Sequence, residues 1–590
     1  MKSKFHVTTL LHQWDVLNPD FDPKKLLNAG VNYVTLPIMW SRVEKEYDVW
    51  DWDYYIPIIE KIIESGFKIV IMLDAGGRLD FDDQGNPLIG TCVLPNYVIA
   101  NHDLLQMDFE GNACLQLNFS NKDSLHFVSH FYKNALSTLG SRFKDHIFAI
   151  AISVHSECEV KYGQNNYVWR DYSKITKDKF YDETGLTAPV VNYGRPIAAN
   201  PGECIGYSAW MRFREKEIVS FVSQLSALIR AHDFLSMAYF GEFFTSHDAI
   251  SQVSVIGELA GCIDCVAIDY NFYSGWDVDP NPWRIPLMAN YCRTLGYKFV
   301  FGGYYVERWR DPVGAPGSPV KMEIWPVVAE SILEARHNDL IDGIEIGGLG
   351  NMNRDLRALS TPLMRAAIEG RIPANQTAKK YRIGIYCSHE NFEWFVGEWD
   401  QKRNIHQQSV TASFALLAHS GSFEPIIISE KTFDKSPSAI ASLDAIYIPH
   451  QPFITDAALR PLRQFAESRA LVQDLRAGEW GDDGRYRGDW MHDLFGIGGV
   501  VWENGGEFVS GSMPANTISG HSSHALMSAE DKATILEPSL RDPDIGLIIK
   551  TQRTIAFGYI PAIIPGLEGE IWKDRFLREI AILIDEQNHN

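Results

Sequence analysis

The sequence predicts an α/β protein: a (β/α)8 TIM barrel followed by a flavodoxin-like α/β domain with a β-rich insertion. Three observations support this prediction. Eight apolar, β-branched runs precede residue 351, helical patterns separate most of them, and no G-x-G-x-x-G turn follows the first run. Strands that alternate with helices imply right-handed crossovers and a parallel sheet. The competing doubly wound sheet normally has fewer strands and a glycine-rich first turn.

The eight predicted strands of the barrel share uninterrupted apolar composition, which is typical of strands buried on both faces. Apolar residues at helical spacing mark three of the intervening helices, at Tyr55–Ser65, Phe213–His232 and Pro326–His337. The predicted strands are Phe5–Leu11, Val31–Trp40, Phe67–Asp74, Ile147–Val154, Leu235–Phe244, Cys265–Tyr273, Lys298–Val306 and Gly343–Gly348.

A second α/β pattern follows a linker at 371–380, so we predict a catalytic barrel over 1–375 and a second domain over 381–590. A Gly/Ser-rich stretch with short β segments indicates a β insertion at about 500–545. The predicted elements are strands at Tyr381–Cys387, Phe423–Ile428 and Ala445–Pro449, helices at Gln407–Ser420, Asp456–Arg469 and Trp572–Glu586, and a hairpin at Ile545–Ile560.

The composition narrows the class of function. A net charge of −21 argues against nucleic acid as a partner. Among eight cysteines the only close pair is Cys262 and Cys265, and no second pair completes a zinc set, so we expect no metal and no cofactor. The first residues lack the apolar core of a signal peptide, and no run approaches the length of a membrane helix, so the expected location is the cytoplasm.

Acidic residues follow two of the predicted strands directly. The fourth strand runs into Glu157 and Glu159, and the seventh into Glu307. In a parallel barrel these carboxyl ends form the catalytic face, and two carboxyl groups are the minimum for cleaving a glycosidic bond. We predict Glu157 as proton donor, with Glu159 as the competing residue, and Glu307 as nucleophile. Glu345 and Glu242, inside their strands, are the reserve carboxylates.

Other residues near strand ends are candidates for contact with a sugar. Each has an alternative structural interpretation, such as core packing for an aromatic ring or a hydrogen bond for His155. Long loops rich in aromatic residues follow several strands and favour cleft walls. The predicted substrate-binding residues are Trp40, Asp74, His155, Glu159, Asp269, Tyr270, Tyr273, Trp276, Trp309 and Glu345.

Several segments resemble one known family. Residues 35–44 (TLPIMWSRVE) and 50–54 (WDWDY) resemble the opening motifs of family 42 glycoside hydrolases, which are mostly retaining β-galactosidases of clan A. Residues 146–157 (HIFAIAISVHSE) are similar to that family's fourth strand, and residues 265–273 (CVAIDYNFY) to its sixth. The second domain resembles the family's trimerisation domain, with residues 444–449 (DAIYIP) as the matching strand.

The resemblance implies a retaining exo-β-glycosidase of the β-galactosidase type, acting on a neutral carbohydrate, with Glu157 as acid/base and a homotrimeric assembly. Ser156 stands where clan A has an asparagine that contacts the sugar, so β-mannosidase, β-glucosidase and α-L-arabinopyranosidase activities stay open. Residues 159–162 (EVKY) also resemble a motif of the inverting β-amylases. A non-catalytic sugar-binding protein is the rival, and a glutamine amidotransferase is excluded because no cysteine follows the strand before His450.

Overall fold

A computed structural model describes most of the chain, which divides into two compact units, one mainly of residues up to 374 and one mainly of residues from 375 onward. The described residues are 5–19, 21–77, 93–155, 158–162, 171–190, 206–241, 252–271, 281–305, 324–347, 359, 361–370, 380–394, 405–487, 490–503, 524–539, 542–564 and 566–589.

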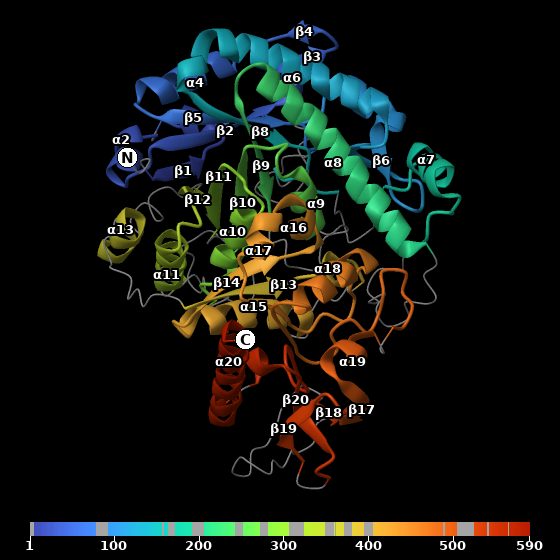
Figure 1. The fold of residues 1–590 in the computed structure, drawn as a ribbon. Helices are drawn as coiled ribbons and strands as arrows, with labels where there is room; N and C mark the ends of the chain where they lie inside the picture. The colour runs from blue at the N-terminus through green and yellow to red at the C-terminus, as the bar shows by residue number, and fades with distance from the viewer. Residues whose placement is uncertain are drawn as a thin grey trace, which may run out of the picture. The chain divides into compact units, whose positions relative to one another are not determined.

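Eight parallel strands close into a barrel in the first unit, as predicted (Figure 1). Each barrel strand pairs with the barrel strand that precedes it in the sequence, and β1 closes the ring by pairing with both β2 and β12. The ring consists of β1 (His6–Leu10), β2 (Tyr33–Met39), β5 (Lys68–Asp74), β8 (Ile147–Ser153), β9 (Leu235–Phe240), β10 (Cys265–Asn271), β11 (Phe299–Tyr305) and β12 (Gly343–Gly347).

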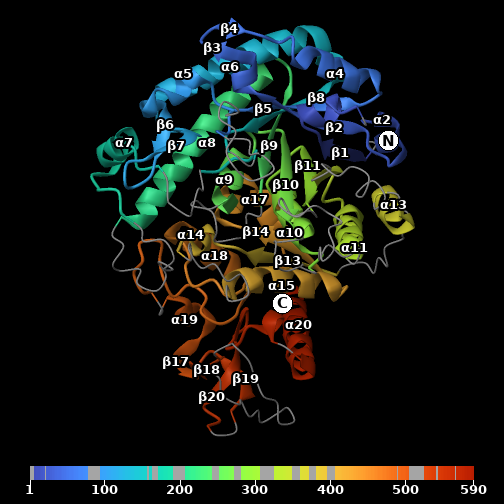
Figure 2. The same cartoon turned by 180° about the vertical axis from the view of Figure 1, so that it is seen from behind.

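Helices surround this barrel and cover the outward faces of its strands (Figures 1 and 2). In α4 (Tyr55–Glu64), for example, Ile58, Ile59 and Ile62 form the buried stripe that the helical spacing predicts. The other helices of eight or more residues are α6 (Lys122–Phe143), α7 (Lys174–Thr184), α8 (Tyr207–Ala231), α9 (Gln252–Leu259), α10 (Arg284–Thr294), α11 (Ile324–His337) and α13 (Pro362–Glu369).

Short elements complete the described part of the first unit. Two hairpins extend the loops on the carboxyl side of β2 and β5, because their strands lie between those barrel strands and the next long helix. These elements are α1 (Gln13–Leu17), α2 (Pro23–Asn28), α3 (Trp40–Val43), β3 (Glu44–Glu46), β4 (Val49–Trp50), α5 (Asn96–Ile99), β6 (Leu105–Met107) and β7 (Ala113–Leu117).

The inside of the barrel is filled by side chains in layers. Phe148 and Phe299 pack around His6 near the amino ends of the strands. Burial lowers the pKa of His6, which favours a neutral ring in this apolar layer. Above it, small and aliphatic residues of the inward faces form a continuous core that includes Ala151 and Ala267. The interior is therefore a packed core, and the only inward positions left for chemistry are those at the carboxyl ends of the strands.

The second unit is an α/β domain with the flavodoxin strand order, as predicted. Its parallel strands run β14-β13-β15-β16-β21, and antiparallel strands extend the sheet beyond β21 through β20, β18 and β17, with β19 on β20. The strands are β13 (Tyr381–Tyr386), β14 (Phe423–Ile428), β15 (Ala445–Ile448), β16 (Ala470–Gln473), β17 (Ile497–Glu503), β18 (His524–Ala529), β19 (Thr534–Pro538), β20 (Ile545–Lys550) and β21 (Thr554–Phe557).

Helices connect these strands, and the last closes the chain. Thr455 caps the first turn of the helix that follows β15 by accepting a hydrogen bond from the backbone N–H of Ala458. The described helices are α14 (His389–Trp394), α15 (Ile405–His419), α16 (Glu430–Lys435), α17 (Pro437–Ala441), α18 (Asp456–Ala466), α19 (Trp490–Phe495) and α20 (Gly566–Asn588). None of the helices in the described ranges is both long and apolar enough to cross a membrane.

Candidate active site

Three neighbouring strands place two carboxyl groups and a glycine in one row at the carboxyl end of the barrel. Asp269 of β10 pairs with Gly303 of β11, and Gly303 pairs with Glu345 of β12. Residues that share a row of a parallel barrel point to the same side. The two carboxyl groups therefore approach each other across a position that carries no side chain.

Glu345 is held by two hydroxyl groups from strands on other sides of the ring. Its Oε2 accepts hydrogen bonds from Thr35 Oγ1 at 2.7 Å and from Tyr239 OH at 2.8 Å. The two hydroxyl oxygens are themselves 3.1 Å apart. Burial and the nearby charge of Glu345 raise the pKa of Tyr239 well above its usual value. The phenol therefore stays protonated and donates a hydrogen bond to Glu345. Two donors on one carboxylate oxygen favour the charged form of Glu345.

Asp269 has the opposite environment. Its Oδ1 atom is buried and has no hydrogen-bond partner in the described part of the chain. A Cβ placed on Gly303 would lie 1.8 Å from this oxygen, so the carboxyl group occupies the space that the glycine leaves. Burial first, and then the charges of Glu345 and Glu159, raise the pKa of Asp269 well above 3.8. Asp269 therefore holds its proton more tightly than a free aspartate does, and a carboxyl with a raised pKa beside other carboxyl groups is typical of functional sites.

A tight turn after β8 brings a third carboxylate to this end of the barrel. Cys158 adopts a left-handed conformation (φ 67°), and its N–H donates to His155 O at 2.9 Å. The chain then pairs with β9 through the N–H of Val160, which donates to Tyr239 O. Glu159 is consequently buried and forms an ion pair of 2.8 Å with Lys161. A Cβ on Gly241 would lie 2.9 Å from its carboxylate, so this close approach also depends on a glycine.

Asp74 and His155 lie beside this turn. Asp74 ends β5, and its Oδ1 accepts hydrogen bonds from Ser153 Oγ at 2.7 Å and from the Gly76 N–H at 3.1 Å. His155 is buried, with 2% of its surface exposed. A Cβ on Gly76 would overlap the carbonyl of His155, so the two backbones are in direct contact. The structure thus places both residues at the carboxyl ends of their strands, where substrate contact was predicted.

Two aromatic residues predicted to bind substrate are buried and packed against other side chains, and their contact with substrate stays a prediction. Trp40 is fully buried, lies parallel to the ring of Phe131 at 5.4 Å, and donates its indole N–H to Glu44 at 2.6 Å. Tyr270 is also buried; it follows Asp269, and Arg284 of α10 lies 5.6 Å from the centre of its ring. Because adjacent strand residues point to opposite faces, Tyr270 faces the helical layer while Asp269 faces the barrel axis.

Several predicted site residues lie outside the described residues. They include both members of the predicted catalytic pair, so their roles stay predictions from the sequence. These residues are Glu157, Glu307, Tyr273, Trp276 and Trp309, together with the reserve carboxylate Glu242.

Four residues of the candidate site do not stand at strand ends in the sequence and were not predicted. Thr35 and Tyr239 lie at inward positions inside strands, and a period-two reading of β2 and β9 could have marked them as polar groups facing the barrel axis. Gly303 has no chemistry of its own and acts only through the space it leaves. Lys161 is two residues from Glu159 in the sequence, and this spacing alone does not predict that the two side chains form an ion pair.

We expect Asp269→Asn to stabilise the protein. Because the folded state holds the proton of Asp269 above pH 3.8 and the unfolded chain releases it, this carboxyl lowers the free energy of unfolding as pH rises from 3.8 toward its raised pKa. Asparagine lacks this cost, so calorimetry at pH 7 should show a higher Tm; for a unit of this length, a gain of about 1 kcal/mol raises Tm by roughly 1–2 °C. The difference should shrink toward pH 3.8.

A charged, paired aspartate of the same barrel is the control. Asp342 forms an ion pair of 2.6 Å with Arg293 and accepts a hydrogen bond from the Val300 N–H at 2.9 Å. Asp342→Asn should therefore lower Tm at pH 7. A comparable loss of stability in Asp269→Asn would contradict the raised pKa of that carboxyl.

No cluster of three or more His, Cys, Asp and Glu residues that could hold a metal ion occurs among the described residues. The described residues bring carboxyl, hydroxyl and ammonium groups to this end of the barrel. Glu345 and Glu159 both lie within electrostatic range of Asp269.

Comparison with solved structures shows the same fold in glycoside hydrolases. A family 42 β-galactosidase from G. stearothermophilus superposes with a TM-score of 0.70 at 12% identity, covering 99% of this chain and 88% of that chain. The cold-adapted β-galactosidase from Rahnella sp. R3 gives 0.67 at 12% identity, over 98% and 89%. An exo-β-1,4-mannosidase from Opitutaceae bacterium strain TAV5 gives 0.57 at 12%, over 98% and 95%. No family model and no curated protein matches the sequence.

Proposed function

We propose that this protein is a retaining exo-β-glycosidase that removes a terminal sugar from a neutral oligosaccharide or glycoside. The observation that carries the proposal is the row of Asp269, Gly303 and Glu345 at the carboxyl end of a closed barrel, beside the Glu159–Lys161 pair. Barrel enzymes bind substrate at this end. The fold shared with β-galactosidases and a β-mannosidase supports the same class of reaction.

The catalytic pair in this proposal is Glu157 and Glu307. Glu157 follows β8 by four residues in the sequence, and Glu307 follows β11 by two, so each comes directly after a strand of the ring. Glu157 protonates the leaving oxygen, and Glu307 attacks the anomeric carbon to form a glycosyl-enzyme that water then hydrolyses. As a proton donor near neutral pH, Glu157 needs a raised pKa, which burial or a neighbouring negative charge would supply.

A panel of nitrophenyl glycosides tests the proposal. The β-galactoside and the β-mannoside are the first substrates, because the structural neighbours include enzymes of both names; the β-glucoside and the α-L-arabinopyranoside complete the panel. We expect turnover of at least one β-configured substrate. Sugar binding by calorimetry without turnover of any glycoside would instead favour the non-catalytic sugar-binding alternative. Assembly as a trimer remains a prediction for light scattering.

A further inference from the structure

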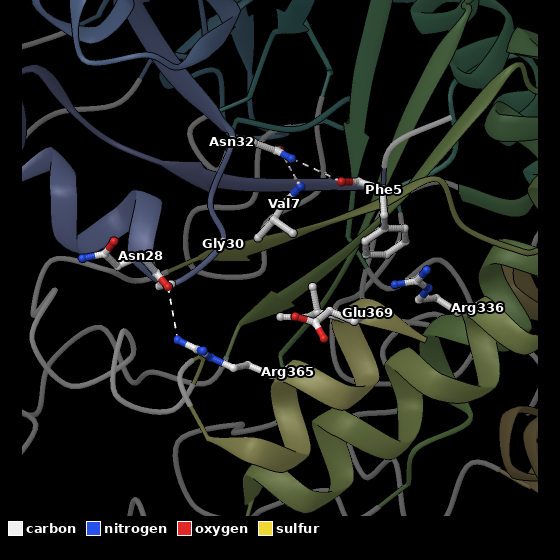
Figure 3. A pocket seen from close by; sticks show the side chains of 10 residues that line it. Phe5, Val7, Asn28, Gly30, Asn32, Arg336, Arg365 and Glu369 are labelled. Atoms are coloured by element: carbon white, nitrogen blue, oxygen red, sulfur yellow. Dashed lines mark hydrogen bonds between the residues drawn. The ribbon is translucent and has the colours of Figure 1, made fainter. Parts of the chain in front are cut away.

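A pocket lies at the amino end of the barrel, where its strands begin. It has a volume of about 410 Å³ and is formed by the residues around the start of β1, the loop between α2 and β2, and the last turns of α11 and α13 (Figure 3). Its lining includes Phe5, Asn28, Arg336, Arg365 and Glu369. Phe5 precedes β1 and Arg336 lies in the last turn of α11, before β12 begins. The pocket is therefore at the opposite end of the barrel from Asp269 and Glu345.

Arg336 presents an unsatisfied donor in this pocket. The guanidinium carbon of Arg336 lies 4.1 Å from the centre of the Phe5 ring, a distance typical of a cation–π contact. Its Nη1 atom is buried and has no hydrogen-bond acceptor among the described residues. Burial lowers the pKa of Arg336, with only partial compensation from Asp339. A buried donor without an acceptor is costly, so an acceptor from outside the protein would remove a real penalty.

Arg365 supplies a second cation to the same pocket. Its Nη2 atom donates to the carbonyl of Asn28 at 3.2 Å, which orients the guanidinium along the pocket wall (Figure 3). Thr361 caps α13 and Pro362 occupies its first turn, so the helix that carries Arg365 begins at a defined position. Glu369 lies one turn later on α13 and, in the view of Figure 3, between the two guanidinium groups.

Among the described residues, no carboxylate oxygen lies within 4.0 Å of a guanidinium nitrogen of Arg336 or Arg365, whereas other arginines of the chain form such ion pairs. The chain as a whole is acidic, with 75 acidic and 54 basic side chains. With Glu369 counted, the charged lining residues still sum to a net charge of +1, from two arginines and one glutamate. The pocket is thus a local positive site on an acidic protein.

We propose that this pocket binds a small organic anion, with Arg336 and Arg365 holding its oxyanion head. A guanidinium group presents parallel N–H donors that match a carboxylate or a phosphoryl group. Phe5, Val7 and Ile368 offer apolar surface to the body of the ligand. The side chain of Asn32 is bonded to the backbone: its Oδ1 accepts a hydrogen bond from the Val7 N–H, and its Nδ2 donates one to Phe5 O. Asn32 therefore forms part of the pocket wall, and the two arginines are the groups that would bind the anion.

Calorimetric titration with two anions, inorganic phosphate and propionate, tests the proposal at constant ionic strength set with sodium chloride. We expect saturable binding of at least one anion, and the tighter of the two identifies the phosphoryl or the carboxylate class. Arg336→Gln should weaken binding at least about tenfold, which corresponds to the loss of one hydrogen bond to a charged group. Arg365→Gln, which changes an exposed side chain, should weaken binding in the same direction without affecting folding.

Two further variants separate this proposal from a structural role for Arg336. Glu369→Gln should tighten anion binding, because it removes the one negative charge of the lining. Arg230→Gln, on α8 near Asp264 at 3.9 Å, should leave binding unchanged. If neither anion binds saturably at millimolar concentration, or if both Arg336→Gln and Arg365→Gln bind as the parent does, the proposal is wrong.

Discussion

Glu307→Gln is expected to abolish turnover, with kcat reduced by roughly 10⁴-fold or more, as for loss of other catalytic nucleophiles. Glutamine keeps the shape of the side chain but cannot form the glycosyl-enzyme. The measurement is the rate of nitrophenol release from the best substrate of the panel. Retention also predicts that NMR of the first-formed sugar shows the anomer of the substrate. An inverted first product would contradict the nucleophilic role of Glu307.

Glu157 variants are expected to show the pattern of a proton donor. Glu157→Gln should slow substrates with poor leaving groups by about 10²–10⁴-fold and activated aryl glycosides much less, because a good leaving group needs little protonation. Azide should partly rescue Glu157→Ala by filling the vacated space. Glu159→Gln is the matched control, since Glu159 is ion-paired with Lys161. A dead Glu159→Gln with an active Glu157→Gln would reverse this assignment.

Glu430→Gln is expected to destabilise the second unit by about 3–5 kcal/mol, the typical cost of breaking a buried ion pair. Glu430 begins α16 and is buried. Its carboxylate accepts hydrogen bonds from Tyr386 OH at 2.5 Å and Ser388 Oγ at 2.7 Å, and forms an ion pair with His389 Nδ1 at 3.0 Å. Glutamine removes one of the two carboxylates that face His389, the other being Glu390, whose Oε1 lies 3.4 Å from His389 Nε2. Urea unfolding monitored by circular dichroism measures the change.

The pH dependence of this destabilisation has a defined sign. Against the opposing effect of burial, Glu430 and Glu390 together raise the pKa of His389 to about 10 through their charges and hydrogen bonds. His389 and the hydroxyl donors lower the pKa of Glu430 to about 2, again against burial. The contribution of Glu430 is complete above its usual 4.5 and disappears as pH falls through 2. That of His389 is complete below 6.5 and disappears as pH rises through 10.

The difference between the parent and Glu430→Gln should therefore be greatest between pH 4.5 and pH 6.5. Glu424→Gln provides a control on the strand that precedes α16, because Glu424 forms only an exposed ion pair of 3.4 Å with Arg382. That change should cost less than about 1 kcal/mol. Equal effects of the two substitutions would show that the buried pair adds no special stability.

The fold could be predicted from the sequence because its signals are local. Each barrel strand is an apolar run bounded by a turn, and all eight predicted runs are strands of the closed barrel. The ends were less predictable: β2 stops at Met39, and Trp40 begins a short helix. Composition cannot distinguish the last residue of a strand from the first turn of a helix when both are apolar.

The site could be predicted only in part, because its geometry depends on contacts between distant residues. Asp74 and Asp269 were predicted from their places near strand ends, and the structure places both at that end of the barrel. The packing of Trp40 and Tyr270 could not be predicted, because an aromatic ring near a strand end can face either the cleft or the helical layer, and only the packing partner decides. The His389–Glu430 pair was missed because the two residues are 41 positions apart and nothing in either local sequence links them.

The empty position at Gly303 also constrains how this barrel can change by mutation. Alanine at 303 would place its Cβ 1.8 Å from Asp269 Oδ1, so it is disfavoured while aspartate remains at 269. A shorter residue at 269 removes that obstacle. The effects of substitutions at the two positions are therefore not independent, and the order of changes matters: 269 must be shortened before 303 can gain a side chain. Libraries that vary strand β11 alone should recover glycine at 303, whereas libraries that vary both strands together should recover paired replacements.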